Sequence, residues 1–358
     1  MKTPRHLPFD QWPTPDRQAW QQAMRPAGVF DDAGPAAHWR DSTRAQIQRQ
    51  YGYWLTYCQQ AGILLEQGDT IVDRVTAANV HAFIQHLSST ISINTTALYV
   101  ANLLCALRAM APDQDWTWLQ TLAQRLERQV KGSVIDKRPC LRNAGVLVEL
   151  GFALTDEASV PLADAADLTG KALIHARSQY RDGLLIALLA LRPLRKGTLA
   201  QIRIDHELRA IGGEWHLVFN GDQTKTGQPL EYVLPKLLYP VLEIYLTRVR
   251  PLFPNSDGHD ALWASNEGGP MSASGITKRV RLWTVQRLGT AISPHRFRDC
   301  AASTLANRAP KQVRLAAALL GHTNLATTER YYIQADNLEA GRQYQDVVTA
   351  LAPRKGRR

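Results

Sequence analysis

The sequence has 358 residues, which is the length of about two ordinary domains. Hydrophobic residues make up 45% and charged residues 21%, a balance that excludes a long disordered chain. No run approaches the roughly 18 apolar residues of a membrane span, and the first residues lack the apolar core of a secretory signal. We therefore expect a cytoplasmic protein. The net charge of +10 favours a polyanionic partner, nucleic acid before a membrane surface.

The first half of the chain predicts an irregular arm followed by a small helical bundle. Residues 1–36 are rich in Pro, Gln and Asp, with little periodicity, and we assign them to the arm. Over residues 37–131, apolar side chains recur at helical spacing, which predicts a helical domain. Its four expected helices begin near Asp41, after a cap at Thr76, near Ile93 and after Asp115.

Residues 132–142 are polar and basic and are interrupted by Gly132 and Pro139, a composition typical of a linker. Beyond them we predict a second domain over residues 143–352 and a basic tail over 353–358. This domain should be mainly helical, with one small antiparallel sheet.

The spacing of apolar residues changes along the second domain, and this change predicts where its helices and strands lie. One helix should end near Leu154, and a longer one should cover about residues 168–191. Residues 208–211 and 214–219 then predict a hairpin with a Gly-Gly turn, and residues 230–234 a third strand. The remaining helices are expected at about 240–249, 273–288, 294–308, 311–320, 325–333 and 337–351.

An ordered set of basic residues, followed by a tyrosine, runs through the second domain. There is no GxSxG, HExxH, GxGxxG or Walker motif to indicate other chemistries, and no CxxC pair to indicate a zinc ribbon. The set consists of Arg195 after an apolar helix, Lys225 in a turn between strands, His295 and Arg298 three apart on one helix, His322 after Gly321, and Tyr331 in Thr-Thr-Glu-Arg-Tyr-Tyr.

In this order and context, the set resembles the tyrosine recombinases, or phage integrases. The resemblance covers residues 140–350 strongly and about 40–130 weakly. It implies a helical core-binding domain followed by an α+β catalytic domain. Two positions depart from the family pattern: Thr198, where the family often has Glu, and Asp299, where it often has His. Arg192 is a rival for the first arginine, but the local Leu-Arg-x-x-x-Leu spacing favours Arg195.

The residue types suit cleavage of a phosphodiester. Two guanidiniums, Arg195 and Arg298, can clamp the non-bridging oxygens and offset the charge gained in the transition state. A tyrosine phenol, with a pKa of about 10, must lose its proton as it attacks. Tyr331 is the expected nucleophile, ahead of Tyr332, and would form a 3′-phosphotyrosyl link.

The other members of the set have supporting roles in this scheme. His295 accepts the phenol proton or positions the phosphate, and His322 donates a hydrogen bond to the phosphate. Lys225 supplies a proton to the leaving 5′-oxygen. The resemblance implies neither a metal nor a nucleotide cofactor.

The resemblance also implies the partners. Double-stranded DNA would lie in a clamp between the two domains, and a homotetramer on two DNA sites would recombine them, with the last helix docking on a neighbouring subunit. Basic residues near the linker are candidates for contact with the DNA backbone: Arg125, Arg128, Lys131, Lys137 and Arg138. A site-specific recombinase is thus expected. The alternatives are a strand-relaxing enzyme similar to type IB topoisomerases and a DNA-binding relative that does not cut.

Overall fold

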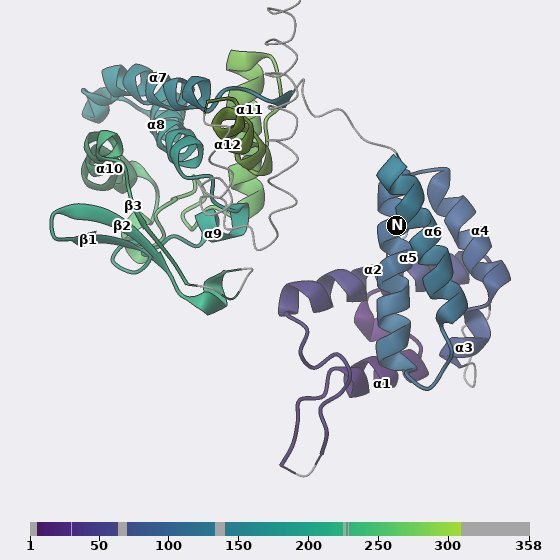
Figure 1. Ribbon diagram of the computed structural model, residues 1–358. Helices are drawn as coiled ribbons and strands as arrows, with labels where there is room; N and C mark the ends of the chain where they lie inside the picture. Colours follow the sequence, from purple (N-terminus) through teal and green to yellow (C-terminus); the bar gives the residue numbers. More distant parts are fainter. Residues whose placement is uncertain are drawn as a thin grey trace, which may run out of the picture. The chain divides into compact units, whose positions relative to one another are not determined.

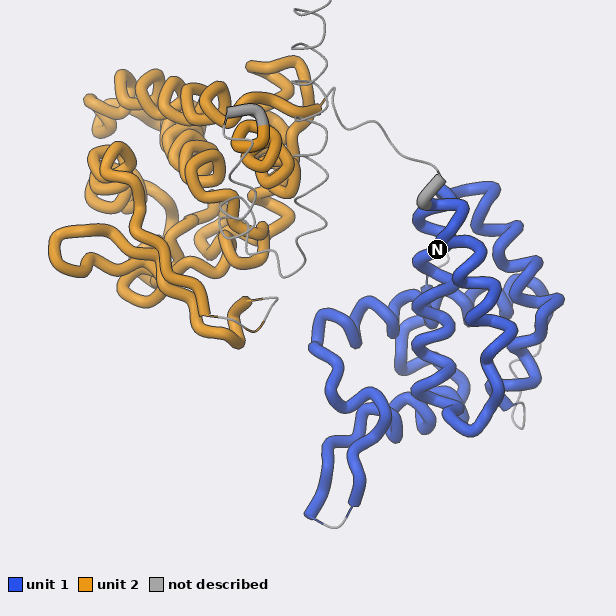
Figure 2. The backbone as a smooth tube through the Cα atoms, viewed as in Figure 1, with its two compact units in different colours: residues 1–136 blue, residues 137–358 orange. Residues whose placement is uncertain are grey.

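A computed structural model of the chain describes residues 6–29, 31–63, 70–132, 140–224, 227 and 229–308. The chain divides into two compact units, residues 1–136 and 137–358 (Figure 2). In the part of the chain that the structure describes, no helix combines the length and the hydropathy of a membrane span. The described residues form mainly helices, with one small antiparallel sheet, as predicted (Figure 1).

The first unit is a bundle of helices around an aromatic-rich core (Figure 1). Its helices are α1 (Thr14–Ala23), α2 (Asp41–Gln60), α3 (Ile71–Arg74), α4 (Ala77–Ser88), α5 (Ile93–Met110) and α6 (Thr117–Gly132). The four helices expected from the sequence are confirmed as α2, α4, α5 and α6. The predicted cap is also present, because the Thr76 side chain accepts a hydrogen bond from the backbone N–H of Asn79. In the core, the rings of Trp54 and Phe83 pack edge to face, with 5.1 Å between their centroids.

The prediction of an irregular arm over residues 1–36 is wrong, because α1 lies within it and belongs to the core of the first unit. The side chains of Trp12 and Trp20 are buried there. Asp16, also buried, accepts hydrogen bonds from Tyr51 Oη at 2.5 Å and from Arg74 Nη2 at 2.5 and 2.6 Å. Aromatic burial and this ion pair hold a helix that is too short to show periodicity.

In the second unit, a three-stranded sheet lies at one side of the helices (Figure 1). The elements of this unit are α7 (Ala144–Leu162), α8 (Gly170–Leu191), α9 (Lys196–Ala200), β1 (Leu208–Ile211), β2 (Glu214–Phe219), β3 (Leu230–Val233), α10 (Tyr239–Ile244), α11 (Ala273–Leu288) and α12 (Pro294–Arg308), with a π-helical turn (Tyr245–Val249) after α10. Of these helices, α8 is the most buried. The helices predicted beyond residue 308 lie outside the described residues, and so do most residues of the predicted linker.

The sheet has the order β1-β2-β3, and all pairs are antiparallel. The predicted hairpin is confirmed: Gly212 and Gly213, between β1 and β2, have φ values of 59° and 82°. Two consecutive left-handed residues define the turn that glycine accommodates best. In register, Leu217 of β2 lies opposite Leu208 of β1 and Tyr232 of β3, which fixes the position of Tyr232 on the sheet.

Helices α7 and α8 cross closely because each has a glycine at the contact. A Cβ built on Gly183 would lie 2.7 Å from the carbonyl oxygen of Gly151. The prediction that the first helix ends near Leu154 is wrong, since α7 continues to Leu162. Ala158 and Leu162 are buried and continue the apolar stripe through a polar stretch. This crossing fixes α8, whose C-terminal end leads into the site.

Candidate active site

Arg195 and Arg298, which are far apart in the sequence, line one pocket of the second unit. Arg195 precedes α9, and Arg298 lies in the second turn of α12. The Nη1 atom of Arg298 donates a hydrogen bond to the carbonyl oxygen of Pro193 at 2.6 Å. This bond ties the start of α12 to the chain two residues before Arg195. The structure therefore brings together the two arginines that the sequence predicts to clamp a phosphate.

Local sequence explains how each arginine reaches the pocket. Helix α8 stops at Leu191 because Pro193 cannot continue it. The chain then turns, and Arg195 has the extended conformation of an N-cap residue, with φ −69° and ψ 142°. Helix α9 is anchored by Trp263, whose indole N–H donates to the Leu199 carbonyl at 2.9 Å. Arg195 is thus held between two fixed elements.

The pocket has a strongly cationic character. Burial and, to a smaller extent, the neighbouring charge of Arg195 together lower the pKa of Arg298 to about 10. Arg298 therefore remains protonated at neutral pH, in a position where its charge is poorly hydrated. Among the described residues that line the pocket, none carries a carboxylate. A bound anion would stabilise both guanidiniums through charge-assisted hydrogen bonds.

Of the two departures from the family pattern, Thr198 lies in the pocket, and Asp299 lies next to a residue that lines it. Thr198 is buried and lines the pocket. Asp299 is buried beside Arg298 on α12 and accepts a hydrogen bond from Arg296 at 2.9 Å. A hydroxyl and a paired carboxylate thus take the places of the Glu and the His.

Sequence reasoning missed two residues of this pocket. The sequence presents Arg192 only as a rival of Arg195, yet both line the pocket, and Tyr232 of β3 lines it as well. Arg192 stacks on the Tyr232 ring, with 5.6 Å between the guanidinium carbon and the ring centroid. The presence of two arginines in Arg-Pro-Leu-Arg was a signal for Arg192, whereas no local pattern indicates Tyr232.

The remaining predicted site residues divide into two groups. His295 lies one turn before Arg298 on α12, and its side chain is exposed. Lys225, His322 and Tyr331 lie outside the described residues. Of the predicted DNA-contact residues, Arg125 and Arg128 are exposed on α6 of the first unit, and Lys131 belongs to the same helix. Lys137 and Arg138 lie outside the described residues.

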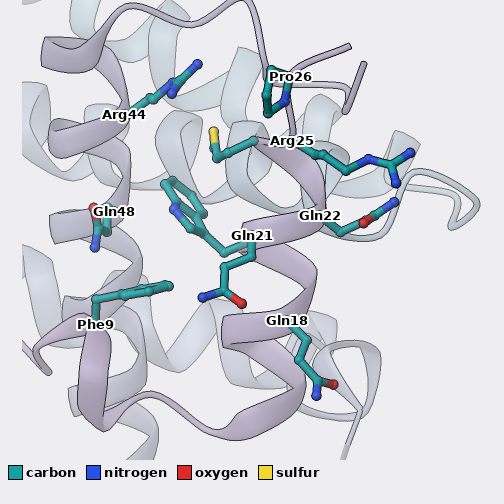
Figure 3. Close-up of a pocket in the computed structure, with 10 residues that line it drawn as sticks. Phe9, Gln18, Gln21, Gln22, Arg25, Pro26, Arg44 and Gln48 are labelled. Carbon is teal, nitrogen blue, oxygen red and sulfur yellow. The ribbon is translucent and has the colours of Figure 1, made fainter. Parts of the chain in front are cut away.

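A second pocket lies on the first unit, along α1 and α2, with a volume of about 690 Å³ (Figure 3). Glutamine and arginine side chains dominate its polar lining: Gln18, Gln21, Gln22, Gln48, Arg25 and Arg44. Among the described residues that line it there is no Asp, Glu, His or Cys. It offers hydrogen bonds without an acid, a base or a nucleophile, so the arginine pocket is the better candidate for chemistry.

The fold and the site together define a mainly helical protein of two units. In its second unit, two partly buried arginines lie in one pocket, where they can bind an anion. Comparison with known proteins agrees with this class. Residues 165–338 match the model of the phage integrase family, and this segment includes both arginines. Residues 165–338 thus form a domain of the phage integrase family, the tyrosine recombinases.

Two curated relatives illustrate the similarity. Tyrosine recombinase XerC of Mannheimia succiniciproducens is 40% identical over 85 residues, which are 24% of this chain and 28% of that protein. XerC of Histophilus somni is 31% identical over 181 residues, which are 50% of this chain and 52% of that protein. The matches therefore span about a quarter to a half of the length of these relatives.

One solved structure supports the fold. The XerH site-specific recombinase bound to palindromic difH substrate has a TM-score of 0.53 and 15% sequence identity. The match covers 81% of this chain and 75% of that chain.

Proposed function

We propose that this protein is a site-specific DNA recombinase that cleaves and rejoins strands through a covalent 3′-phosphotyrosyl intermediate. The observation that carries the proposal is the meeting of Arg195 and Arg298 in one cationic pocket. The family match over residues 165–338 supports it, because this segment holds all six predicted catalytic residues. Double-stranded DNA is the proposed substrate, and its phosphodiester is the anion bound in the pocket.

The proposed reaction conserves the number of phosphodiester bonds. The Tyr331 oxygen attacks the phosphorus, the bond from phosphorus to the 5′-oxygen breaks, and a 3′-phosphotyrosyl link forms. His295 accepts the phenol proton, and Lys225 gives a proton to the 5′-oxygen. Attack by the 5′-hydroxyl of a second strand reverses these steps and releases Tyr331.

Arg195 and Arg298 stabilise the charge that the phosphate gains as Tyr331 attacks. His322 adds a hydrogen bond to the same phosphate. This assignment needs no step beyond proton transfer and displacement at phosphorus, so the energy of the broken bond is retained in the intermediate.

The first unit would hold the DNA, and the second would cut it. Exposed Arg125 and Arg128 on α6 suit contact with the phosphate backbone, and Lys131, Lys137 and Arg138 continue the basic series into the linker. We assign the first unit, including α1, to DNA binding and residues 143–352 to catalysis. Exchange between two sites requires four cleavages, and a homotetramer supplies one Tyr331 for each.

A covalent-trap assay tests the proposal directly. The protein is mixed with fragments of the DNA that flanks its gene, nicked so that the cut strand diffuses away and cannot be rejoined. Complexes that survive SDS are then separated and the attached DNA is sequenced. The wild-type protein should form an adduct, and Tyr331→Phe should form none, because phenylalanine lacks the attacking oxygen.

Tyr332→Phe is the matched control, since it changes the adjacent tyrosine and should retain the adduct. An adduct that persists in Tyr331→Phe and disappears in Tyr332→Phe would transfer the nucleophile to Tyr332. Absence of any adduct, despite DNA binding, would favour a relative that binds without cutting. Relaxation of supercoiled DNA without strand exchange would instead favour the topoisomerase-like activity.

A further inference from the structure

A third guanidinium, that of Arg192, belongs to the arginine pocket. Arg192 follows the last residue of α8, and its backbone N–H donates to the Leu188 carbonyl at 2.7 Å. Its side chain is half-buried and lines the pocket together with Arg195 and Arg298. Three guanidiniums thus line one small space, and their positive charges would all attract an anion that binds there.

The contacts of Arg192 fix its guanidinium without neutralising it. Its Nη2 atom donates to the Val233 carbonyl at 3.2 Å, and its guanidinium carbon lies 5.6 Å from the Tyr232 ring centroid. Both contacts come from β3. The Nε atom of Arg192 is buried, and no described residue accepts a hydrogen bond from it. A buried donor without an acceptor costs free energy, which a ligand oxygen would offset.

Tyr232 is suited to be the platform for this guanidinium. It lies on β3 opposite Leu217 of β2, so the sheet fixes its backbone. Burial raises the pKa of its phenol, against the opposing effect of Arg298, Arg192 and Arg195. The phenol therefore stays neutral, and the ring remains available for stacking by a planar cation.

We propose that Arg192, held on the ring of Tyr232, binds the DNA phosphate in this pocket as a third guanidinium beside Arg195 and Arg298. This inference rests on the proposed function, because the anion is a phosphate of the DNA backbone. Arg192 contacts the substrate, whereas Tyr232 is a positioning residue that acts through Arg192. The alternative is that Arg192 only joins the end of α8 to β3.

The salt dependence of DNA binding separates these two roles. Binding of a fluorescent duplex of scrambled sequence to the full-length protein is measured by anisotropy over a series of KCl concentrations. Each phosphate contact contributes about 0.9 to the slope of log Kd against log salt concentration. Arg192→Ala should make this slope less steep by about 0.9, because one contact is lost. A structural role alone would leave the slope unchanged.

Arg248→Ala is the matched control, because it removes the same charge from an exposed side chain of the π-helical turn, away from the arginine pocket. It should keep the wild-type slope. Tyr232→Ala should lower the slope in the same direction as Arg192→Ala, and Tyr232→Phe, which keeps the ring, should restore it. If Arg192→Ala fails to fold, Arg192→Gln removes the charge while keeping most of the side-chain volume.

Each outcome decides the inference. A wild-type slope in Arg192→Ala, or in Arg192→Gln, would overturn it, even where the wild-type protein forms the phosphotyrosyl adduct. If Arg192→Ala has a reduced slope but the wild-type protein forms no adduct, the phosphate contact would be supported and the recombinase chemistry would be wrong. If the wild-type protein bound the duplex without salt dependence, both the DNA partner and the role of Arg192 would be wrong.

Discussion

Asp16 shows how a single buried charge holds an element that its own sequence supports weakly. Its carboxylate is fully buried and forms an ion pair with Arg74 Nη2 at 2.5 Å, and Tyr51 donates to it as well. Asp16→Asn leaves the Arg74 charge buried without a counter-ion, which typically costs about 3–5 kcal/mol. We expect α1 to detach from α2 and α3. Urea unfolding measures the loss in the free energy of unfolding. Hydrogen exchange of peptides from these helices, in the absence of urea, shows whether α1 has lost its protection.

Asp41→Asn is a suitable control, because Asp41 is exposed in the first turn of α2. Removing an exposed charge there should cost roughly 0.5 kcal/mol. A similarly small effect for Asp16→Asn would mean that Arg74 finds another partner and that α1 is held by Trp12 and Trp20 alone.

The residues of the site differ in how far the sequence predicts them. Arg195 and Arg298 follow from local motifs: one precedes a helix after Pro193, and the other lies on a helix that begins at Pro294. Arg192 and Tyr232 meet only because β3 lies beside the end of α8, and no local pattern encodes that contact. The sequence thus predicts residues that belong to motifs, whereas tertiary packing adds their neighbours.

At the scale of elements, the crossing of α7 and α8 holds the helix whose C-terminal end leads to Arg192 and Arg195. The two helices approach closely at Gly151 and Gly183, where added side chains would meet backbone atoms. Gly183→Ala would place a Cβ 2.7 Å from the Gly151 carbonyl oxygen. Forcing the helices apart should cost about 1–3 kcal/mol. Hydrogen exchange of α7 and α8 peptides in the full-length protein should become faster.

Gly197→Ala supplies the comparison, since Gly197 lies on α9 and a Cβ there would meet no atom within 4 Å. That change should be neutral or stabilise the helix by up to about 1 kcal/mol. Equal protection of α7 and α8 in both variants would show that the crossing tolerates a methyl group.

The elements that the sequence predicts best have clear signals at both ends. Helix α11 has the predicted bounds, with Ser272 as its cap and Gly289 in the left-handed conformation after it. Helix α1 was missed because its ten residues hold few apolar side chains and depend on tertiary contacts. In α7, the polar residues after Leu154 resemble those at the end of a helix, although buried apolar residues continue at helical spacing to Leu162.

At the scale of the whole molecule, the chain separates into two units with different surfaces. The described part of the second unit contains the arginine pocket, while α6 of the first unit exposes Arg125 and Arg128. Exposed arginines contact phosphates in any sequence and contribute affinity. Buried arginines at a reacting phosphate contribute to the rate, because their stabilisation grows as charge develops. Binding and cleavage should therefore respond to different variants.

This division can be measured with variants of each unit on the DNA fragment recovered by covalent trapping. The double variant Arg125→Ala, Arg128→Ala should raise Kd and lower the salt slope by about 2, since two phosphate contacts are lost. At saturating protein, its adduct should form at the wild-type rate.

Arg298→Lys keeps the charge but loses the planar fork, so its adduct should form about a hundredfold more slowly, with Kd little changed. Arg287→Lys, on an exposed part of α11, is the control for the second substitution. If the α6 variant slowed the adduct at saturation, the first unit would take part in the chemical step, and the separation of roles would be wrong.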